Sequence, residues 1–95
     1  MAGWTYIMTN KPRGVLYIGV AASLAQRVQQ HREGQGSKFC ARYNLKTLVL
    51  AAHHDTIDDA IWREKMLKEW KREWKIELIE RSNPEWRDLF YDIRE

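Results

Sequence analysis

The chain has 95 residues, of which 44% are hydrophobic and 31% charged, a balance that indicates one folded domain and excludes a disordered chain. Its 16 lysines and arginines against 13 aspartates and glutamates give a formal net charge of +3, a mild basic bias that suits a nucleic-acid partner without requiring one. The single cysteine, Cys40, excludes an intramolecular disulfide and a cysteine-rich zinc site. We expect residues 1–95 to form a single domain.

The sequence carries no pattern that would direct it to a membrane. Its first residues lack the charged segment and apolar run of a secretory signal, and no apolar stretch approaches the roughly 18 residues that span a bilayer. Together with the lone cysteine, these features predict a cytoplasmic protein with no membrane partner.

The first part of the chain predicts a β-hairpin followed by a helix. Trp4–Thr9 and Val15–Val20 are rich in aromatic and β-branched residues, which favour strands. Asn10–Gly14 lies between them and holds the proline and glycine of a turn, so the two strands should pair antiparallel. Ser23 is a typical N-cap for a helix over Leu24–Arg32.

The second part predicts a third strand and further helices. Residues 37–44 predict a basic loop with at most a short helical turn, and the continuously apolar Thr47–Ala52 predicts a central or buried strand. Thr56, followed by two aspartates, predicts the start of a helix that runs to about Trp70 or Trp74. Two shorter helical stretches should follow, over Ile76–Ile79 and Trp86–Tyr91. The fold class is therefore α+β, a small antiparallel three-stranded sheet flanked by helices.

One carboxylate lies at the end of an apolar helical stripe. Ile57, Ala60, Ile61 and Glu64 recur at the three-and-four spacing of one helix face. One interpretation is a boundary glutamate paired with Lys68 on the next turn. The other is a carboxylate held at the sheet edge for a hard cation, since Mg²⁺ sites often combine one or two carboxylates with substrate phosphate.

Arg27 and His31 are four residues apart, on the side of their helix that carries Leu24 and Val28. They form either an amphipathic rim of partly buried polar side chains or a cation and an imidazole directed at one phosphate.

A basic segment follows, in which Lys38, Arg42 and Lys46 alternate with the aromatic residues Phe39 and Tyr43. Basic residues among aromatics suit the backbone and bases of nucleic acid, although a solvated loop anchored by two rings gives the same pattern.

Other conspicuous residues predict packing or exposure rather than chemistry. His53 and His54 are adjacent on a strand, so they point to opposite faces and cannot chelate one ion together. Three tryptophans recur at helical spacing and predict packing rather than ligand stacking: Trp62, Trp70 and Trp74.

The chain resembles the GIY-YIG nuclease domain in the order and spacing of its two tyrosines, the arginine–histidine pair and the later glutamate. Tyr17-Ile18-Gly19 matches the second half of that signature, whereas Trp4-Thr5-Tyr6 keeps only the tyrosine of the first half. This departure resembles the small single-domain members of the superfamily, which are similar to the N-terminal endonuclease domain of UvrC. The resemblance covers nearly the whole chain.

The resemblance implies hydrolysis of phosphodiester bonds with Mg²⁺ or Mn²⁺ as cofactor. It assigns Glu64 as the metal ligand and Arg27 as the cation at the scissile phosphate, with Gly19 as a motif residue that lets the backbone turn close to the site. The expected catalytic set is Tyr6, Tyr17, Arg27, His31 and Glu64. The basic segment and a late asparagine supply the expected substrate-binding set: Lys38, Arg42, Tyr43, Lys46 and Asn83.

A tyrosine can take a proton from water only if its pKa, about 10 when unperturbed, is lowered by neighbouring cations. We expect Tyr6 to act as this base, with Tyr17 orienting the water or the phosphate.

The leading hypothesis is a metal-dependent endonuclease that acts on nucleic acid with low sequence specificity. DNA is favoured, and structured DNA in repair or recombination is a suitable substrate. The alternatives are a catalytically idle nucleic-acid-binding module and an interaction domain recruited by a protein partner that supplies targeting. Retention of both tyrosines, Arg27 and Glu64 favours chemistry.

Overall fold

Three antiparallel strands form the middle layer of the molecule. In the computed structural model, which describes residues 1–93, β1 (Gly3–Thr9) lies between β2 (Leu16–Ala21) and β3 (Thr47–His54). Both pairings are antiparallel, as the hairpin prediction required for β1 and β2. The outer edge of β2 is therefore an edge of the sheet.

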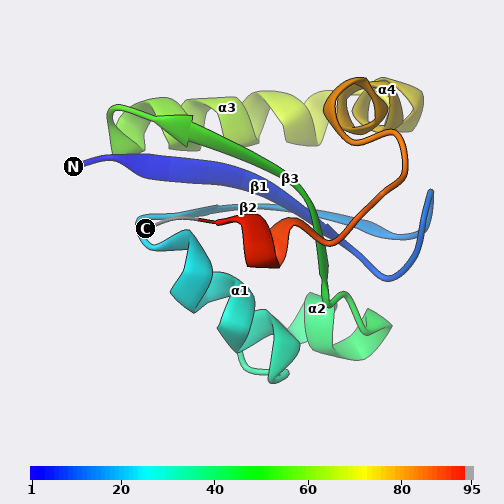
Figure 1. Ribbon diagram of the computed structural model, residues 1–95. Helices are drawn as coiled ribbons and strands as arrows, with labels where there is room; N and C mark the ends of the chain where they lie inside the picture. The colour runs from blue at the N-terminus through cyan, green and yellow to red at the C-terminus, as the bar shows by residue number, and fades with distance from the viewer. Residues whose placement is uncertain (94–95) are drawn as a thin grey trace.

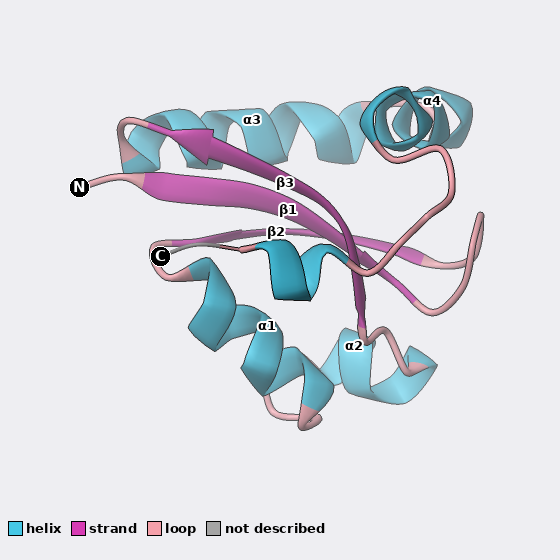
Figure 2. Cartoon of the chain, in the orientation of Figure 1, coloured by secondary structure: helices cyan, strands magenta, loops and turns pink. Residues whose placement is uncertain are grey.

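Helices cover both faces of this sheet, so it is enclosed between two helical layers (Figures 1 and 2). On one face lie α1 (Leu24–Arg32), α2 (Lys38–Tyr43) and a short 3₁₀ helix, η1 (Leu89–Asp92). On the other face lie α3 (Ile57–Glu69) and α4 (Arg72–Ser82). No helix within residues 1–93 is long and apolar enough to cross a membrane.

Each face of the sheet has its own hydrophobic core, and the alternation of side chains along the strands fills both. Tyr6 and Met8 of β1 pack with Leu24 and Val28 of α1, whereas Ile7, between them in sequence, packs into the other core. The second core is completed by residues of β2, β3, α3, α4 and the following loop: Ile18, Val49, Leu67, Ile79 and Trp86. The α+β class predicted from the sequence is confirmed.

The continuously apolar strand β3 is an edge strand rather than a central one. Leu48 packs into one core and Val49 into the other. A continuously apolar pattern indicates that both faces of a strand are buried. An edge strand between two helical layers meets this condition as well as a central strand does.

The basic segment 37–44 forms a helix, α2, where the sequence predicted mainly a loop. Ser37 caps it, because its hydroxyl accepts hydrogen bonds from the backbone N–H groups of Phe39 and Cys40. Asn44 ends it in the left-handed conformation, with a φ of 59°. Cys40, at 1% exposure, anchors the helix to the core.

The other helices differ from the predictions mainly at their ends. Ser23 stands at the N-cap of α1 without a side-chain capping bond, whereas the hydroxyl of Thr56 caps α3 by accepting from Asp59 N–H. α3 ends at Glu69, and α4 is a full helix where a short stretch was predicted. The terminal 3₁₀ helix η1 is shorter than the predicted Trp86–Tyr91, since Trp86 has a φ of 56° and cannot belong to a right-handed helix.

The prediction that all three tryptophans pack was wrong for two of them. Trp62 is 63% exposed and Trp74 49% exposed, while Trp70 packs against the second core. Trp62 lies on α3 and Trp74 on α4, and the Trp74 ring meets Trp70 only edge-on, at 6.2 Å. Each of these helices has a solvent face, and the spacing of aromatic residues alone does not say which face that is.

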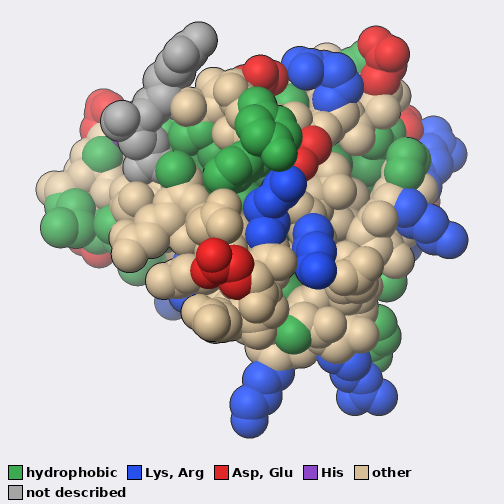
Figure 3. Space-filling view, turned by 60° about the horizontal axis from the view of Figure 1, so that its bottom comes forward, with side chains coloured by type: hydrophobic (Ala, Val, Ile, Leu, Met, Phe, Trp, Pro, Cys, Tyr) green, Lys and Arg blue, Asp and Glu red, His purple; other side chains and the backbone are tan. Residues whose placement is uncertain are grey.

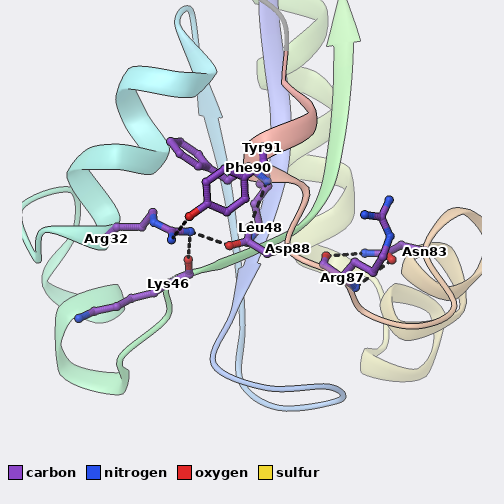
Figure 4. A network of polar contacts seen from close by, with 8 residues as sticks. All are labelled: Arg32, Lys46, Leu48, Asn83, Arg87, Asp88, Phe90 and Tyr91. Carbon is purple, nitrogen blue, oxygen red and sulfur yellow. Dashed lines mark hydrogen bonds and ion pairs between the residues drawn. The ribbon is translucent and has the colours of Figure 1, made fainter.

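The segment after α4 is fastened to the opposite layer by a polar network around Asp88 (Figure 4). The Asp88 carboxylate accepts hydrogen bonds from the Arg32 guanidinium at 2.6 Å and from Leu48 N–H at 3.2 Å. Arg32 also donates to the carbonyl of Lys46 and the hydroxyl of Tyr91. One carboxylate thus ties the end of α1, the start of β3 and η1 together.

We predict that Asp88→Ala lowers the free energy of unfolding by about 1–3 kcal/mol. The substitution removes the carboxylate that accepts hydrogen bonds from Leu48 N–H and the Arg32 guanidinium. Chemical denaturation measures this. The matched control is Asp92→Ala, which removes an exposed ion pair with Arg87 and should change stability by no more than about 0.5 kcal/mol. Equal effects of the two substitutions would contradict the role given to Asp88.

Candidate active site

The two tyrosines of the motif lie on neighbouring strands and point to the same face of the sheet. Tyr6 stands opposite Gly19 and Met8 opposite Tyr17 in the β1–β2 register, and the two tyrosine rings are 6.4 Å apart between centroids. A Cβ atom at Gly19 would lie 2.5 Å from the Tyr6 hydroxyl oxygen. The glycine of the motif is therefore required by close packing against Tyr6.

His31 approaches the tyrosines from α1 and is buried with them. Its Nε2 atom is hydrogen-bonded to the Tyr6 hydroxyl at 2.8 Å, and its ring meets the Tyr17 ring edge-on at 5.4 Å. A Cβ at Gly36 would lie 2.5 Å from Nδ1 of His31, so Gly36 also makes room for this ring. Nδ1 has no hydrogen-bond partner within the described residues.

Burial fixes the protonation of this pair at neutral pH. Burial, with a smaller contribution from the Arg27 charge, lowers the pKa of His31 to about 4, so the imidazole is neutral. Burial also raises the pKa of Tyr6 above its ordinary value, and the hydrogen bond from Arg27 opposes this without overcoming it. Arg27 does lower the pKa of Tyr6, as a base would require, but burial has the larger effect, so the condition for a basic Tyr6 is not met in the free protein. Tyr6 is 0% exposed, so in the free protein it is a protonated group beneath the surface.

Arg27 lies between the buried pair and solvent. It lines a surface hollow of about 360 Å³ with residues of the end of β2, among them Val20 and Ala21. Its guanidinium donates to Gln30, and none of the ion pairs between described residues involves it. An arginine without a carboxylate partner is available to an external anion.

Glu64 belongs to α3 and so to the other helical layer. Its side chain is 16% exposed, and its carboxylate pairs with Lys68 at 3.4 Å. The boundary ion pair predicted as one interpretation of Glu64 is thus present in the free protein. No hydrogen bond or ion pair between described residues joins Glu64 to Tyr6, Tyr17, Arg27 or His31.

The outer edge of β2 is where the two layers come together. A second hollow, of about 280 Å³, is lined by Tyr17 from the tyrosine face and by Lys68 from α3, with Phe39, Lys75 and two residues of β2. Since Lys68 is the partner of Glu64, this carboxylate stands one contact away from the hollow. The two hollows involve the residues on either side of Gly19, Val20 in one and Ile18 in the other.

The predicted substrate-binding residues fall into two groups. Lys38, Arg42 and Tyr43 of α2 and the following Lys46 are exposed, so they are accessible to a ligand. Figure 3, which brings the α1 and α2 side of the molecule forward, shows lysine and arginine side chains projecting from its lower margin.

Asn83, by contrast, is 4% exposed and has a structural role. Its amide donates to the carbonyls of Val49 and Arg87, and its side-chain oxygen accepts from Arg87 N–H. These bonds hold the loop after α4 against β3 and use both N–H donors of the buried amide, so it has no donor left to turn toward a substrate. The bonds between Asn83 and Arg87 are drawn in Figure 4.

Sequence reasoning did not assign Phe39 or Lys75 to the site. Phe39 stands between Tyr17 and Tyr43, with its ring centroid 6.1 Å from the first and 4.9 Å from the second. The alternation of aromatic and basic residues was the available signal for Phe39. Lys75 comes from α4, and no local pattern places it beside β2.

Within residues 1–93 no group of three or more histidine, cysteine, aspartate or glutamate side chains could hold a metal ion. Glu64 offers a single carboxylate, a donor that Mg²⁺ accepts when substrate phosphate and water supply its other ligands. His53 and His54 take no part, since His54 contacts the hydroxyl of Thr5 and His53 lies against Trp4.

Comparison with known proteins identifies the family to which the chain is similar. Residues 2–77 match the model of the GIY-YIG catalytic domain. The chain is 34% identical over 76 residues to the UPF0213 protein SSP2268 of Staphylococcus saprophyticus, covering 80% of this chain and 92% of that protein. It is 35% identical over 66 residues to a UPF0213 protein of Staphylococcus aureus strain Mu3, covering 70% of this chain and 80% of that protein. No solved structure gives a significant match.

We predict that His31 makes the protein acid-sensitive. The unfolded chain takes up a proton near pH 6.5 that the folded chain excludes until about pH 4, so stability is full above this window and falls as the pH is lowered through it. The loss should be about 2–4 kcal/mol. Denaturation at several pH values measures it. His31→Gln should flatten the dependence, whereas His53→Gln, at an exposed position, should leave it intact. A slope unchanged in His31→Gln would show that other groups cause it.

Proposed function

Since the chain belongs to the GIY-YIG family, we propose that it is a metal-dependent endonuclease that hydrolyses phosphodiester bonds in nucleic acid. The observation that supports this most is the arrangement at the outer edge of β2. Tyr17 and Lys68 line one hollow there from the two layers, Arg27 lines a second hollow at the end of β2, and Lys68 is paired with Glu64. A phosphodiester lying along the edge would meet a guanidinium without an ion-pair partner, a phenol and an ammonium whose own partner is the Glu64 carboxylate.

Some residues of the site contact the substrate, and others position these contacting side chains. Arg27 neutralises charge on the non-bridging oxygens, a task that suits the planar guanidinium. Tyr17 lines the hollow and orients the attacking water or the phosphate. Tyr6 and His31 lie beneath, where the protonated phenol and the neutral imidazole fix the positions of Arg27 and the Tyr17 ring.

Glu64 would hold a Mg²⁺ or Mn²⁺ ion. When bound, the ion supplies Lewis acidity at the phosphate and stabilises the leaving oxygen. Lys68 pairs with one oxygen of this carboxylate, so the other oxygen would be open to the ion. The Lys68 ammonium lines the hollow and would be an additional cation for the phosphate backbone.

DNA at low sequence specificity remains the favoured substrate, in the context of repair or recombination, and the protein functions in the cytoplasm. A protein partner that supplies targeting is a second element of this proposal. Trp62 and Trp74 favour it, because both are exposed and tryptophan is enriched at protein interfaces.

We predict that Glu64→Gln abolishes cleavage while the fold is kept, since the change is nearly isosteric and removes the charge that binds the metal. Cleavage of a panel of structured DNAs and RNAs with Mg²⁺ or Mn²⁺ measures the activity, and thermal denaturation checks the fold. Glu69→Gln, at an exposed position on the same helix, is the control and should cut like the wild type. Full activity of Glu64→Gln on a substrate that the wild type cuts would refute the assignment.

For Arg27→Ala we predict a loss of roughly 10²–10³-fold in the chemical rate, as for the removal of one preorganised charge donor. Arg27→Lys should recover part of it, because an ammonium lacks the planar fork. Single-turnover kinetics with saturating protein separates rate from affinity, and Arg81→Ala on α4 is the control. An unchanged rate with weaker binding would make Arg27 a docking residue.

A further inference from the structure

Three aromatic rings form a series that leads from the candidate site onto the surface of α2. Tyr17 lies 6.1 Å from Phe39 with an interplanar angle of 30°, and Phe39 lies 4.9 Å from Tyr43 at 50°. The two residues of α2 are large and exposed, Phe39 at 43% and Tyr43 at 41%. A helix of six residues thus presents two neighbouring rings to solvent.

The surroundings of these rings are cationic. Lys68 and Lys75 line the hollow that Tyr17 and Phe39 share, and the Arg42 guanidinium stands 5.5 Å from the centre of the Tyr43 ring. The sequence contains no aspartate or glutamate between Glu33 and Asp55, so α2 and the loops beside it add no negative charge. A polyanion with flat apolar groups therefore complements this surface in both charge and shape.

We propose that Tyr17, Phe39 and Tyr43 form a stacking platform for unpaired bases next to the scissile phosphate. The substrate class is accordingly nucleic acid that is single-stranded at this point, such as a single strand or a flap. This inference rests on the proposed nuclease function for the position of the cut, and it makes a separate claim about what the surface binds.

Base pairing explains why the platform selects unpaired strands. In a duplex the faces of the bases are stacked on one another, so an exposed protein ring cannot reach them without unstacking. In a single strand every base has a free face, and stacking on an aromatic side chain is largely independent of sequence. The lysines and arginine around the rings then follow the backbone.

Binding without cleavage tests the platform. The probes are a fluorescent 12-nucleotide DNA strand, the duplex of the same strand and an abasic strand of the same length, each titrated by fluorescence anisotropy with a chelator present. The wild type should bind the single strand more tightly than the duplex. Phe39→Leu and Tyr43→Leu should each weaken single-strand binding about 5-fold to 100-fold, as expected for the loss of one stacked base. Their effect on the abasic strand, which keeps the phosphates, should be less than about 2-fold.

The matched control is Trp62→Leu, which removes an exposed ring on α3 and should leave all three affinities unchanged. Circular dichroism verifies that each variant is folded. Equal losses on the base-containing and abasic strands, or no preference for the single strand, would overturn the platform. Cleavage of duplex DNA combined with such a result would leave the nuclease proposal standing. Platform binding by a wild type that cuts none of the tested nucleic acids would instead count against the nuclease proposal alone.

Discussion

Both faces of the three-stranded sheet are covered by helices, and this constraint determines where side chains from the two layers can meet. The sheet separates residues of the two layers, so they can contact one ligand only at an edge of the sheet. The outer edge of β2 is one such edge. Tyr17 and Lys68 line one hollow there, and Arg27 lines another farther along the strand. The sheet edge thus replaces the enclosed pocket that a domain of this size has little room to build.

Beneath this edge two polar side chains are buried in the core. Tyr6 and His31 are both almost completely buried, and the imidazole leaves Nδ1 without a partner. Burying such groups costs free energy that an apolar pair would not. The pair is retained in a position that contacts both Arg27 and Tyr17, which is consistent with positioning of the groups at the surface. Gly19 packs closely against Tyr6, and Gly36 against His31, and a Cβ atom at either glycine would collide with these rings.

Local patterns in the sequence predicted the hairpin, the third strand and the capped start of α3, because each depends on neighbours in the chain. They did not predict that β1 is the central strand, since strand order depends on pairing with the distant β3. The burial of Tyr6, and with it the direction of its pKa change, follows from α1 packing on β1 and is likewise non-local. Asn83 shows the limit of motif matching: its position suggested a ligand contact, but its amide is engaged by Val49 and Arg87.

Glu64 and the tyrosine face are proposed to serve one site across the edge of β2. Paramagnetic relaxation by Mn²⁺ in ¹⁵N-labelled protein, with a short non-hydrolysable phosphorothioate strand present, measures where the ion binds. Relaxation rates converted to metal–proton distances should place the ion at the outer edge of β2, between the amides of Lys68 and Tyr17, and the effect should be lost in Glu64→Gln. Distances that place the ion on the solvent side of α3, away from Tyr17, would contradict a shared site.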